Sequence, residues 1–590
     1  MHAPRLWSAV DGRDTALADG NDFAIKGGGD AQPAAALAMA RGPGPARIRR
    51  SSPLRSRLSA SWPPPDPMRL PSVPPSAATR PVSRLAPVAI ACGLALQAAA
   101  AQAQSQFDAD AATTSGSASM RTLDARIRLG VERLKLPGRE HIGLVGMTEL
   151  LNVSGEWWAG PAVYGAGTGH RGGFFVPGVE GAWSHPVNNW LALDAGVFAG
   201  GGGGGAAPVG GGLMLRPHID VVFRLNGFYT GPTYSKIWFP SGQINASQFG
   251  WMLNVNSSFR YRPAELKGSG TDGSATGLGF DHIDATVTFA RPHKSITTAG
   301  LPLTQRIGFV GLRAERTVDG PFWAGVETAG AASGGVAGYA EVLGTTGLRW
   351  SVVEDRLSLG VRAAAGVGGG GGIDTGGGLL VKAAAGATLR VTDTLGIGAE
   401  VGLVHAPQGR YDARTAAVSL NWALDVPQSD LGSWFKSSPG TPTLMEFGAG
   451  AERYRAARKD GRTEALQAVV LQVNRFVAPN LYVTGQAHSA YAGGAGAYSV
   501  GLFGVGAQLP VATRMRLGIE ALAGAAGGGG VDTGAGAVMQ GRAYVDVSLT
   551  DALSFRVAGG KIKSVHGGLD APVVDAALVF RFGVDRSNRR

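Results

Sequence analysis

Cysteine is nearly missing from this sequence, which has Cys92 alone among its 590 residues. One cysteine cannot form a disulfide within the chain, nor by itself a cysteine-ligated metal site. Charge is also scarce, at 16% of residues where soluble domains usually have ~25%. No apolar run is long enough for a comfortable membrane-spanning helix, and the mean hydropathy is only +0.06. These shortages argue against a disulfide-stapled scaffold and against a bundle of membrane helices.

Glycine, by contrast, is abundant, with 93 residues, and two similar glycine blocks stand out at Gly368–Gly378 and Gly527–Gly536. The blocks belong to a repeating unit, because residues 402–424 align without a gap on residues 560–582, at an offset of 158. A more diverged first copy retains the related motif Gly242–Ala246. This period is far longer than solenoid or propeller repeats. We therefore predict three domain-sized copies, followed by a C-terminal tail: 104–265, 280–424, 441–583 and 584–590.

An export signal is predicted before the first copy. Residues 80–103 have a basic start, a short apolar core and the small-x-small ending Ala101-Gln102-Ala103. We expect cleavage between Ala103 and Gln104. A lipoprotein attachment at Cys92 is less well supported, since only a short apolar stretch precedes it.

Residues 1–79 are rich in Pro, Arg, Ala and Ser without apolar periodicity, which predicts a disordered extension. Met68 is a candidate for the true start, because an ordinary basic region follows it. The segment 1–103 carries 12 of the 54 Lys and Arg and 6 of the 43 Asp and Glu, so the mature chain keeps a net charge of only about +5. No clustered basic face remains, and we expect no nucleic-acid partner.

Apolar and polar residues alternate within each copy, which indicates β-strands. Eight such segments fit into each copy, making 24 strands. In the middle copy they are expected at about 280–293, 303–316, 321–331, 335–351, 355–368, 373–392, 394–407 and 412–424. The alternation places four arginines on the non-apolar faces, where they would line a polar lumen: Arg356, Arg362, Arg514 and Arg516.

The strand Ala576–Phe582 alternates and ends in aromatic residues, and with it the chain resembles the bacterial outer-membrane β-barrel class. The resemblance implies the outer membrane of a Gram-negative bacterium, surrounded by outer-membrane lipid and lipopolysaccharide. It also implies that Phe580 and Phe582 form the signal read by the barrel-assembly machinery. Eight residues follow Phe582, where many members of the class stop, and the earlier copies end in similar aromatic residues at Tyr261 and Trp422.

Two architectures fit the repeat. Our first choice is a single transmembrane antiparallel β-barrel of about 24 strands, whose wide lumen would hold water and pass a polar solute or polymer. The alternative is three tandem eight-stranded barrels, which the long linkers 262–279 and 425–441 favour. The alternative functions are a structural or adhesive surface protein and, with less support, an outer-membrane hydrolase.

No residue pattern indicates catalysis, a cofactor or a metal site. Residues 369–374 satisfy the first six positions of the calcium nonapeptide, but Gly376 stands where a large apolar residue belongs, and the copies are far apart. A phosphate-loop lysine is missing, and the histidines show no metal or nucleophile spacing. We therefore expect no enzyme, and we interpret the glycine blocks as the flexible tops of the fifth and sixth strands, where bends need glycine.

Overall fold

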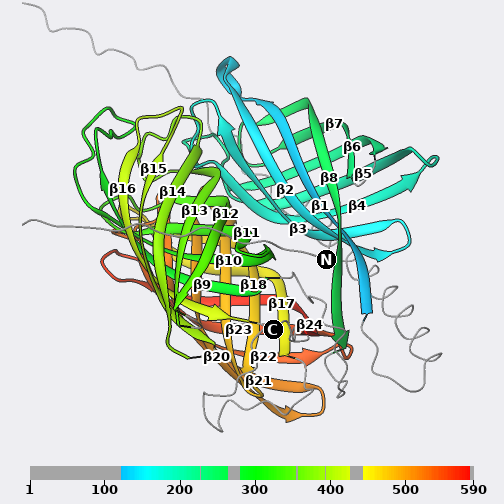
Figure 1. Cartoon of the computed structure of the whole chain (residues 1–590). Helices are drawn as coiled ribbons and strands as arrows, with labels where there is room; N and C mark the ends of the chain where they lie inside the picture. Colours follow the sequence, from blue (N-terminus) through cyan, green and yellow to red (C-terminus); the bar gives the residue numbers. More distant parts are fainter. Residues whose placement is uncertain are drawn as a thin grey trace, which may run out of the picture. The chain divides into compact units, whose positions relative to one another are not determined.

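The computed structural model describes residues 121–225, 228–263, 280–353, 356–392, 394–424 and 443–584. All of them belong to one compact unit, Val82–Arg590. They form 24 strands and one short 3-10 turn at Pro137–Arg139 (Figure 1). Among these residues no helix has the length and apolar character needed to cross a membrane. The predicted cleavage site at Ala103 and Gln104 lies outside the described residues.

Barrel 1 is built from the first eight strands, each paired antiparallel with the next. It closes where β1 pairs with β8, in a register running from Arg121 opposite Tyr261 to Glu132 opposite Gly250. The strands are β1 (Arg121–Lys135), β2 (His141–Ser154), β3 (Trp157–Thr168), β4 (Phe175–Pro186), β5 (Leu191–Gly201), β6 (Leu213–Leu225), β7 (Phe228–Trp238) and β8 (Asn245–Pro263).

Barrel 2 repeats this topology and closes through β9 and β16, with Ala413 opposite Pro292 and Ala423 opposite His282. Its strands are β9 (His282–Pro292), β10 (Ile307–Asp319), β11 (Phe322–Ser333), β12 (Ala340–Val353), β13 (Leu357–Gly369), β14 (Leu379–Arg390), β15 (Leu395–His405) and β16 (Asp412–Ala423).

Barrel 3 closes in the same way through β17 and β24. Its strands are β17 (Thr443–Ala457), β18 (Thr463–Ala478), β19 (Leu481–Ala492), β20 (Ser499–Ala512), β21 (Met515–Gly527), β22 (Ala537–Ser548), β23 (Leu553–Ser564) and β24 (Asp570–Val584). A two-residue pairing, Phe582 with Pro263 and Gly583 with Arg262, also joins β24 to β8 of barrel 1.

The all-β class and the three eight-stranded repeats are confirmed, but the single 24-stranded ring is wrong and the alternative of three barrels holds. Each copy pairs its own first and last strands, over eleven residue pairs in barrel 2 and twelve in barrels 1 and 3. That pairing satisfies both exposed edges within the copy, and free strand edges are what a β-sheet protein must avoid. The wide lumen expected of a single ring is therefore not formed.

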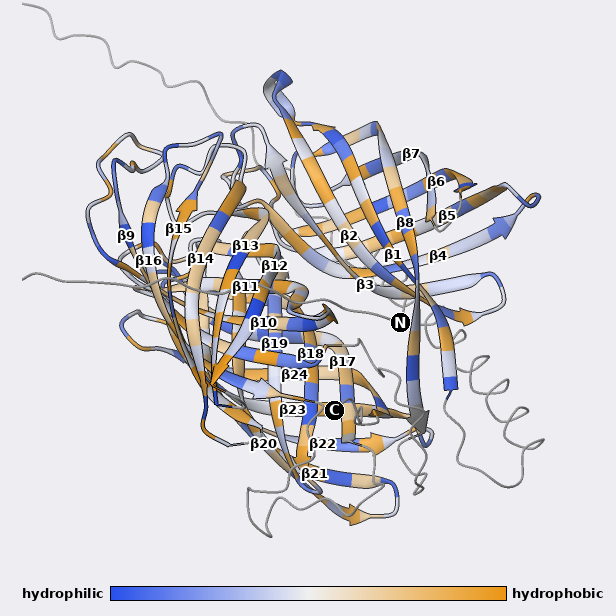
Figure 2. Cartoon of the chain, viewed as in Figure 1, coloured by the Kyte–Doolittle hydropathy of each residue, from blue (hydrophilic) through white to orange (hydrophobic). Residues whose placement is uncertain are grey.

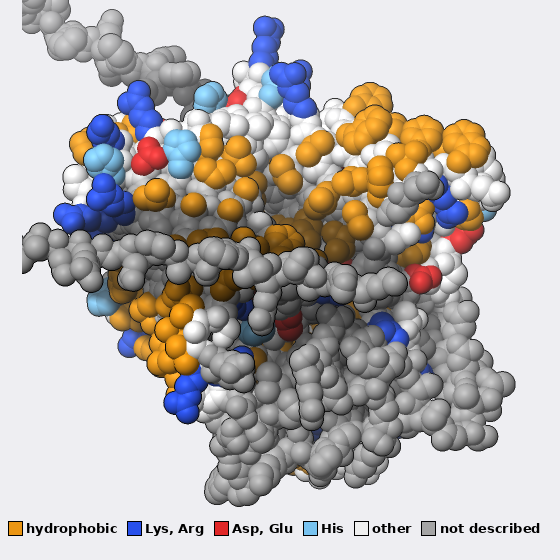
Figure 3. Space-filling model, viewed as in Figure 1, with side chains coloured by type: hydrophobic (Ala, Val, Ile, Leu, Met, Phe, Trp, Pro, Cys, Tyr) orange, Lys and Arg blue, Asp and Glu red, His pale blue; other side chains and the backbone are white. Residues whose placement is uncertain are grey.

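The barrels have inverted polarity, with apolar side chains outside and charged ones inside. Phe249, Val401 and Ile519 are 75%, 66% and 64% exposed, whereas Arg128 and Arg556 are 5% and 0% exposed. The alternation is visible along the strands in Figure 2. On the face shown in Figure 3, apolar side chains cover much of the barrel surface. This arrangement is that of outer-membrane β-barrels, whose outer faces contact lipid.

The two ends of each barrel differ. Within each barrel, the connections after even-numbered strands span two to four residues, and those after odd-numbered strands span five to fourteen. We call these the turn end and the loop end. The turn end also holds the first and last residues of each barrel, and the glycine blocks lie at the loop end.

Candidate functional site

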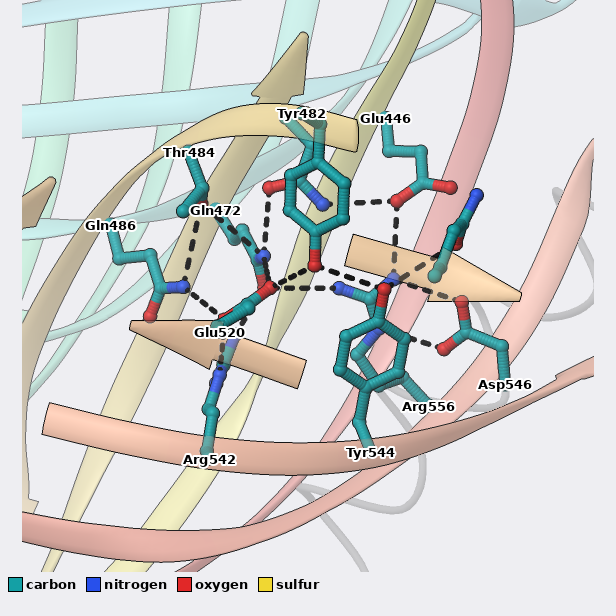
Figure 4. A network of polar contacts seen from close by, with 12 residues as sticks. Glu446, Gln472, Tyr482, Thr484, Gln486, Glu520, Arg542, Tyr544, Asp546 and Arg556 are labelled. Carbon is teal, nitrogen blue, oxygen red and sulfur yellow. Dashed lines mark hydrogen bonds and ion pairs between the residues drawn. The ribbon is translucent and has the colours of Figure 1, made fainter. Parts of the chain in front are cut away.

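The interior of barrel 3 is filled by a network of polar side chains (Figure 4). At its centre, the Glu520 carboxylate accepts hydrogen bonds from Arg542 Nε at 2.5 Å, Tyr482 Oη at 2.7 Å and Gln472 Nε2 at 2.8 Å. These residues come from four strands that alternation alone could not place together. Each is almost fully buried, so the network blocks the barrel interior at this level.

A second cation closes barrel 3 toward its turn end. Arg556 of β23 donates to both carboxylate oxygens of Asp546, at 2.7 and 2.8 Å, and to Glu446 at 3.1 Å. Its guanidinium also lies 3.8 Å from the centre of the Tyr544 ring. The Arg556 side chain has no solvent exposure. An eight-stranded barrel has an interior just wide enough for side chains to fill, and barrel 3 is filled in this manner.

Barrel 1 is sealed by a comparable cluster around Arg128 of β1. The Arg128 guanidinium lies 2.7 Å from Glu180, 3.0 Å from Asp194 and 3.3 Å from Asp220. His218 bridges two of these carboxylates, at 3.3 Å from Glu180 and 3.1 Å from Asp220. All of these groups are buried, so three carboxylates are held in place by one arginine and one histidine.

Barrel 2 contains a looser cluster, whose charged groups are partly exposed. The Glu400 carboxylate accepts from Arg313 at 3.0 Å and from Arg362 at 2.6 Å. Arg362 also donates to Glu327 at 2.5 Å, and Lys382 lies 3.1 Å from the other oxygen of Glu327. The side chain of Glu400 is 22% exposed and that of Lys382 16%, against 0% and 1% for Glu520 and Arg542 in barrel 3.

This exposure comes from a row of cavities inside barrel 2. The largest, about 320 Å³, opens at the turn end and is lined by Arg349, Arg356 and Arg390, among others. Two smaller cavities of about 50 and 30 Å³ continue past Arg362 to Lys382. Beyond them, an apolar layer that includes Phe309, Tyr339, Ile373 and Tyr411 fills the loop end.

The four arginines named from the sequence each occupy a different setting. Arg356 lies at the turn-end mouth of barrel 2, and Arg362 is part of its interior ion cluster. Arg514 lies in the turn between β20 and β21 and is exposed, whereas Arg516 donates to Ser554 Oγ at 2.7 Å inside barrel 3. They line no common lumen, because each pair belongs to a separate barrel.

Several interior charges were not identified from the sequence, including Glu327, Lys382 and Glu400. A usable signal was present: each lies at the inward position of an alternating strand, as in Ala399-Glu400-Val401. A carboxylate flanked by outward apolar residues indicates an interior charge, and such a charge needs a partner on a neighbouring strand. Which partner it finds depends on strand register, which the alternation does not specify.

The aspartates of the two glycine blocks accept hydrogen bonds from the backbone of the loops at the loop end of the barrels. Asp374 Oδ1 accepts from the backbone N–H of Gly376 at 3.1 Å, and Asp532 Oδ1 accepts from that of Gly534 at 3.2 Å. Asp532 Oδ2 also accepts from Gly568 N at 2.9 Å. In the described part of the chain, no three His, Cys, Asp or Glu side chains gather as metal ligands do. The expectation that the protein has no metal or cofactor remains a prediction.

The glycine-rich loops contact one another between barrels. Gly172 N of barrel 1 donates to Gly376 O of barrel 2 at 2.9 Å, and Gly496 N of barrel 3 donates to Gly210 O of barrel 1 at 3.0 Å. Between barrels 2 and 3, a Cβ on Gly527 would overlap the backbone of Gly338. The loops are indeed the tops of the fifth and sixth strands, but they are packed rather than free. Their glycines allow backbones to approach closely.

The predicted assembly residues lie on β24 of barrel 3. Phe582 points outward and is only 5% exposed, because its ring lies 5.2 Å from that of Phe259 and 6.3 Å from that of Tyr261, both on β8. Phe580 lies 6.0 Å from Tyr261. The aromatic ends of the first and third copies therefore pack together. Recognition by an assembly machinery remains a prediction.

We expect Phe582→Ala to lower the amount of folded protein several-fold, while Trp422→Ala has a much smaller effect. Truncating a buried Phe costs about 3–5 kcal/mol, whereas Trp422 is only half-buried. Heat-modifiable mobility on a gel, which separates folded barrels from unfolded chain, measures both variants. Equal losses would contradict the special position of Phe582 at the contact between β24 and β8.

The histidines do not form a recognisable catalytic arrangement among the described residues. His488 contacts Glu452 at 2.8 Å and Gln486 at 3.2 Å, and His405 contacts Asp412 at 2.6 Å. His185, His218 and His282 likewise contact carboxylates, those of Glu156, Asp220 and Asp281. That the protein is not an enzyme remains an expectation.

Comparisons with known proteins identify no family. No family model matches the chain, and no curated protein matches it. Among solved structures it is similar to the ferric enterobactin receptor of Pseudomonas aeruginosa, with 9% identity, a TM-score of 0.25, and coverage of 79% of this chain and 81% of the receptor. It is also similar to Pseudomonas aeruginosa OpdQ (10% identity, TM-score 0.19, 78% and 97% covered) and to the NanC porin (8%, 0.14, 51% and 100%). TM-scores this low support no inference about this chain. Its fold is defined by its own strand pairing.

Proposed function

We propose that this is an outer-membrane protein in which barrel 2 provides a narrow, gated route for small polar solutes, while barrels 1 and 3 are closed. The turn end would face the periplasm and the loop end the exterior, as short periplasmic turns and longer outer loops do in this class. Outer-membrane lipid, lipopolysaccharide and the barrel-assembly machinery would then be its partners.

One observation carries this proposal: in the described part of the chain, barrel 2 combines a row of adjoining cavities, which share lining residues, with a partly exposed ion cluster. Its gate would be the Glu400 carboxylate, which holds Arg313 and Arg362 together across the interior. Without this carboxylate the two guanidinium groups repel each other and draw in water. The apolar layer around Tyr411 closes the outer end in the present conformation.

Planar-bilayer recordings of the refolded protein test the route. We expect small, infrequent conductance steps for the unmodified protein, and steps that are several-fold more frequent for Glu400→Ala. Adding Tyr411→Ala should enlarge the steps, because it thins the apolar layer. The matched control is Asp412→Ala, at the exposed loop end of the same barrel, which should behave like the unmodified protein.

Silence from the unmodified protein and from both opened variants would refute a channel. It would favour the second candidate, a structural or adhesive surface protein. The sealed interiors of barrels 1 and 3 and the interlocked loops support that candidate, because three filled barrels joined at one end make a rigid platform. Deleting the outermost part of the exposed β17–β18 connection, 459–461, would then reduce adhesion without changing conductance.

A further inference from the structure

A separate cavity lies outside the barrel interiors, where outward faces of the three barrels meet. Its volume is about 500 Å³, and its lining is mainly apolar. The principal side chains come from all three copies: Phe175 and Pro177, Leu312 and Val342, and Leu471 and Phe503. All six occupy outward strand positions, where a membrane β-barrel contacts lipid rather than its own core.

The loop end of this cavity is closed by the interlocked glycine loops. The lining there includes Gly173 and Gly203 of barrel 1, Gly338 of barrel 2, and Ala497 and Gly527 of barrel 3. The same backbones make the contacts between barrels, since a Cβ on Gly173 would overlap the Gly369–Gly370 peptide and one on Gly203 would lie 3.1 Å from Ala497 N. A bulky head group therefore has no room at this end.

We propose that the cavity binds the acyl chain of a phospholipid from the periplasmic leaflet. Its lining is mainly apolar, and a hydrocarbon chain is the ligand that gains most by filling such a cavity. The closed loop end excludes lipopolysaccharide, whose head group lies in the outer leaflet, so the chain enters from the turn end. Bound lipid would fill the space between the three barrels, whether or not barrel 2 conducts.

Gly501 offers a variant that fills the cavity without strain. It lies on β20 in the lining, and a Cβ built there meets no atom within 4 Å. Gly541 on β22 is the matched control, because it is equally open but lies outside the cavity lining. Phenylalanine at either position adds the same apolar side chain to an outward barrel face.

Native mass spectrometry of the delipidated full-length protein tests the proposal, with palmitoyl-oleoyl-phosphatidylethanolamine in one arm and lipid A in the other. We expect the protein and Gly541→Phe to retain the phospholipid, Gly501→Phe to retain it several-fold less, and none to retain lipid A. Equal phospholipid retention by both variants, or preferential retention of lipid A, would overturn the proposal.

A second measurement uses the unmodified protein and does not depend on the folding of a variant. A phosphatidylethanolamine with a photoreactive diazirine in its acyl chain is added, and the protein is washed in detergent and irradiated. Labelling should concentrate on peptides containing Leu312, Leu471 and Phe503, relative to fully lipid-exposed strands such as those carrying Phe249 and Val401. Uniform labelling of both sets would also refute the site.

Discussion

Arg556→Met is expected to destabilise barrel 3 by about 3–5 kcal/mol, the usual cost of removing one partner from a buried ion pair. In the unmodified protein, Asp546 and Glu446 both accept hydrogen bonds from the Arg556 guanidinium. The substitution leaves both carboxylates buried beside an apolar side chain. The three barrels need not unfold together, so the effect should be confined to one of them. Residues 443–584 contain no tryptophan, so tryptophan fluorescence would not report the unfolding of barrel 3.

Hydrogen exchange followed by mass spectrometry resolves the barrels separately. Peptides from β21–β24 should exchange much faster in Arg556→Met, while peptides from barrels 1 and 2 remain unchanged. The control is Arg516→Met, because Arg516 is partly exposed and its nearest carboxylate contact, with Asp546, is 3.9 Å long. A contact of this length is weaker than the 2.7–3.1 Å contacts that Arg556 makes with Asp546 and Glu446, so we expect a smaller loss. The double variant Asp546→Asn, Arg556→Met should recover part of the stability lost in Arg556→Met. If Arg556→Met itself lost no more stability than Arg516→Met, the role assigned to Arg556 would be contradicted.

Gly527→Val is expected to separate barrels 2 and 3 at their loop ends without unfolding either. The added side chain would occupy the space of the Gly338 backbone, and backbone cannot move aside as a flexible side chain can. The separation can be measured by cross-linking cysteines introduced at Leu312 and Gly485, where the Leu312 side chain lies 3.5 Å from a Cβ built on Gly485. Cross-linking should fall several-fold in Gly527→Val.

Gly541→Val is the control for this experiment, because its side chain enters open space on an outward face. Both variants should keep their heat-modifiable mobility, which shows that the barrels remain closed. Undiminished cross-linking in Gly527→Val would mean that the glycine loops shift to make room for the added side chain. Contacts deeper in the membrane would then hold the barrels together. Cys92, the single cysteine of the chain, precedes the predicted cleavage site, and it should be replaced wherever that segment is retained, so that the two introduced thiols react only with each other.

Local pattern was enough to predict the strands and their faces. The alternation in 356–367 predicts Val361 outward and Arg362 inward, and the structure has Val361 45% exposed and the Arg362 side chain 9% exposed. Side chains of successive strand residues point to opposite faces for steric reasons that hold at every residue. The repeat added the number of strands per copy, since an offset of 158 residues aligns segments of the second copy with those of the third.

Tertiary structure alone decided how the strands close and which charges meet. Because the copies are similar, the last strand of one copy could also pair with the first strand of the next. The long linkers 262–279 and 425–441 favour closure of each copy on itself, but strand patterns do not decide between the two arrangements. Arg362 finds Glu327 and Glu400 only after the register across β11–β15 is set. The sequence of the glycine blocks likewise does not predict which backbone segments they contact. The sequence by itself determined alternating strands in three copies, and long-range pairing, which depends on edges and shapes brought together by folding, decided that they form three filled barrels.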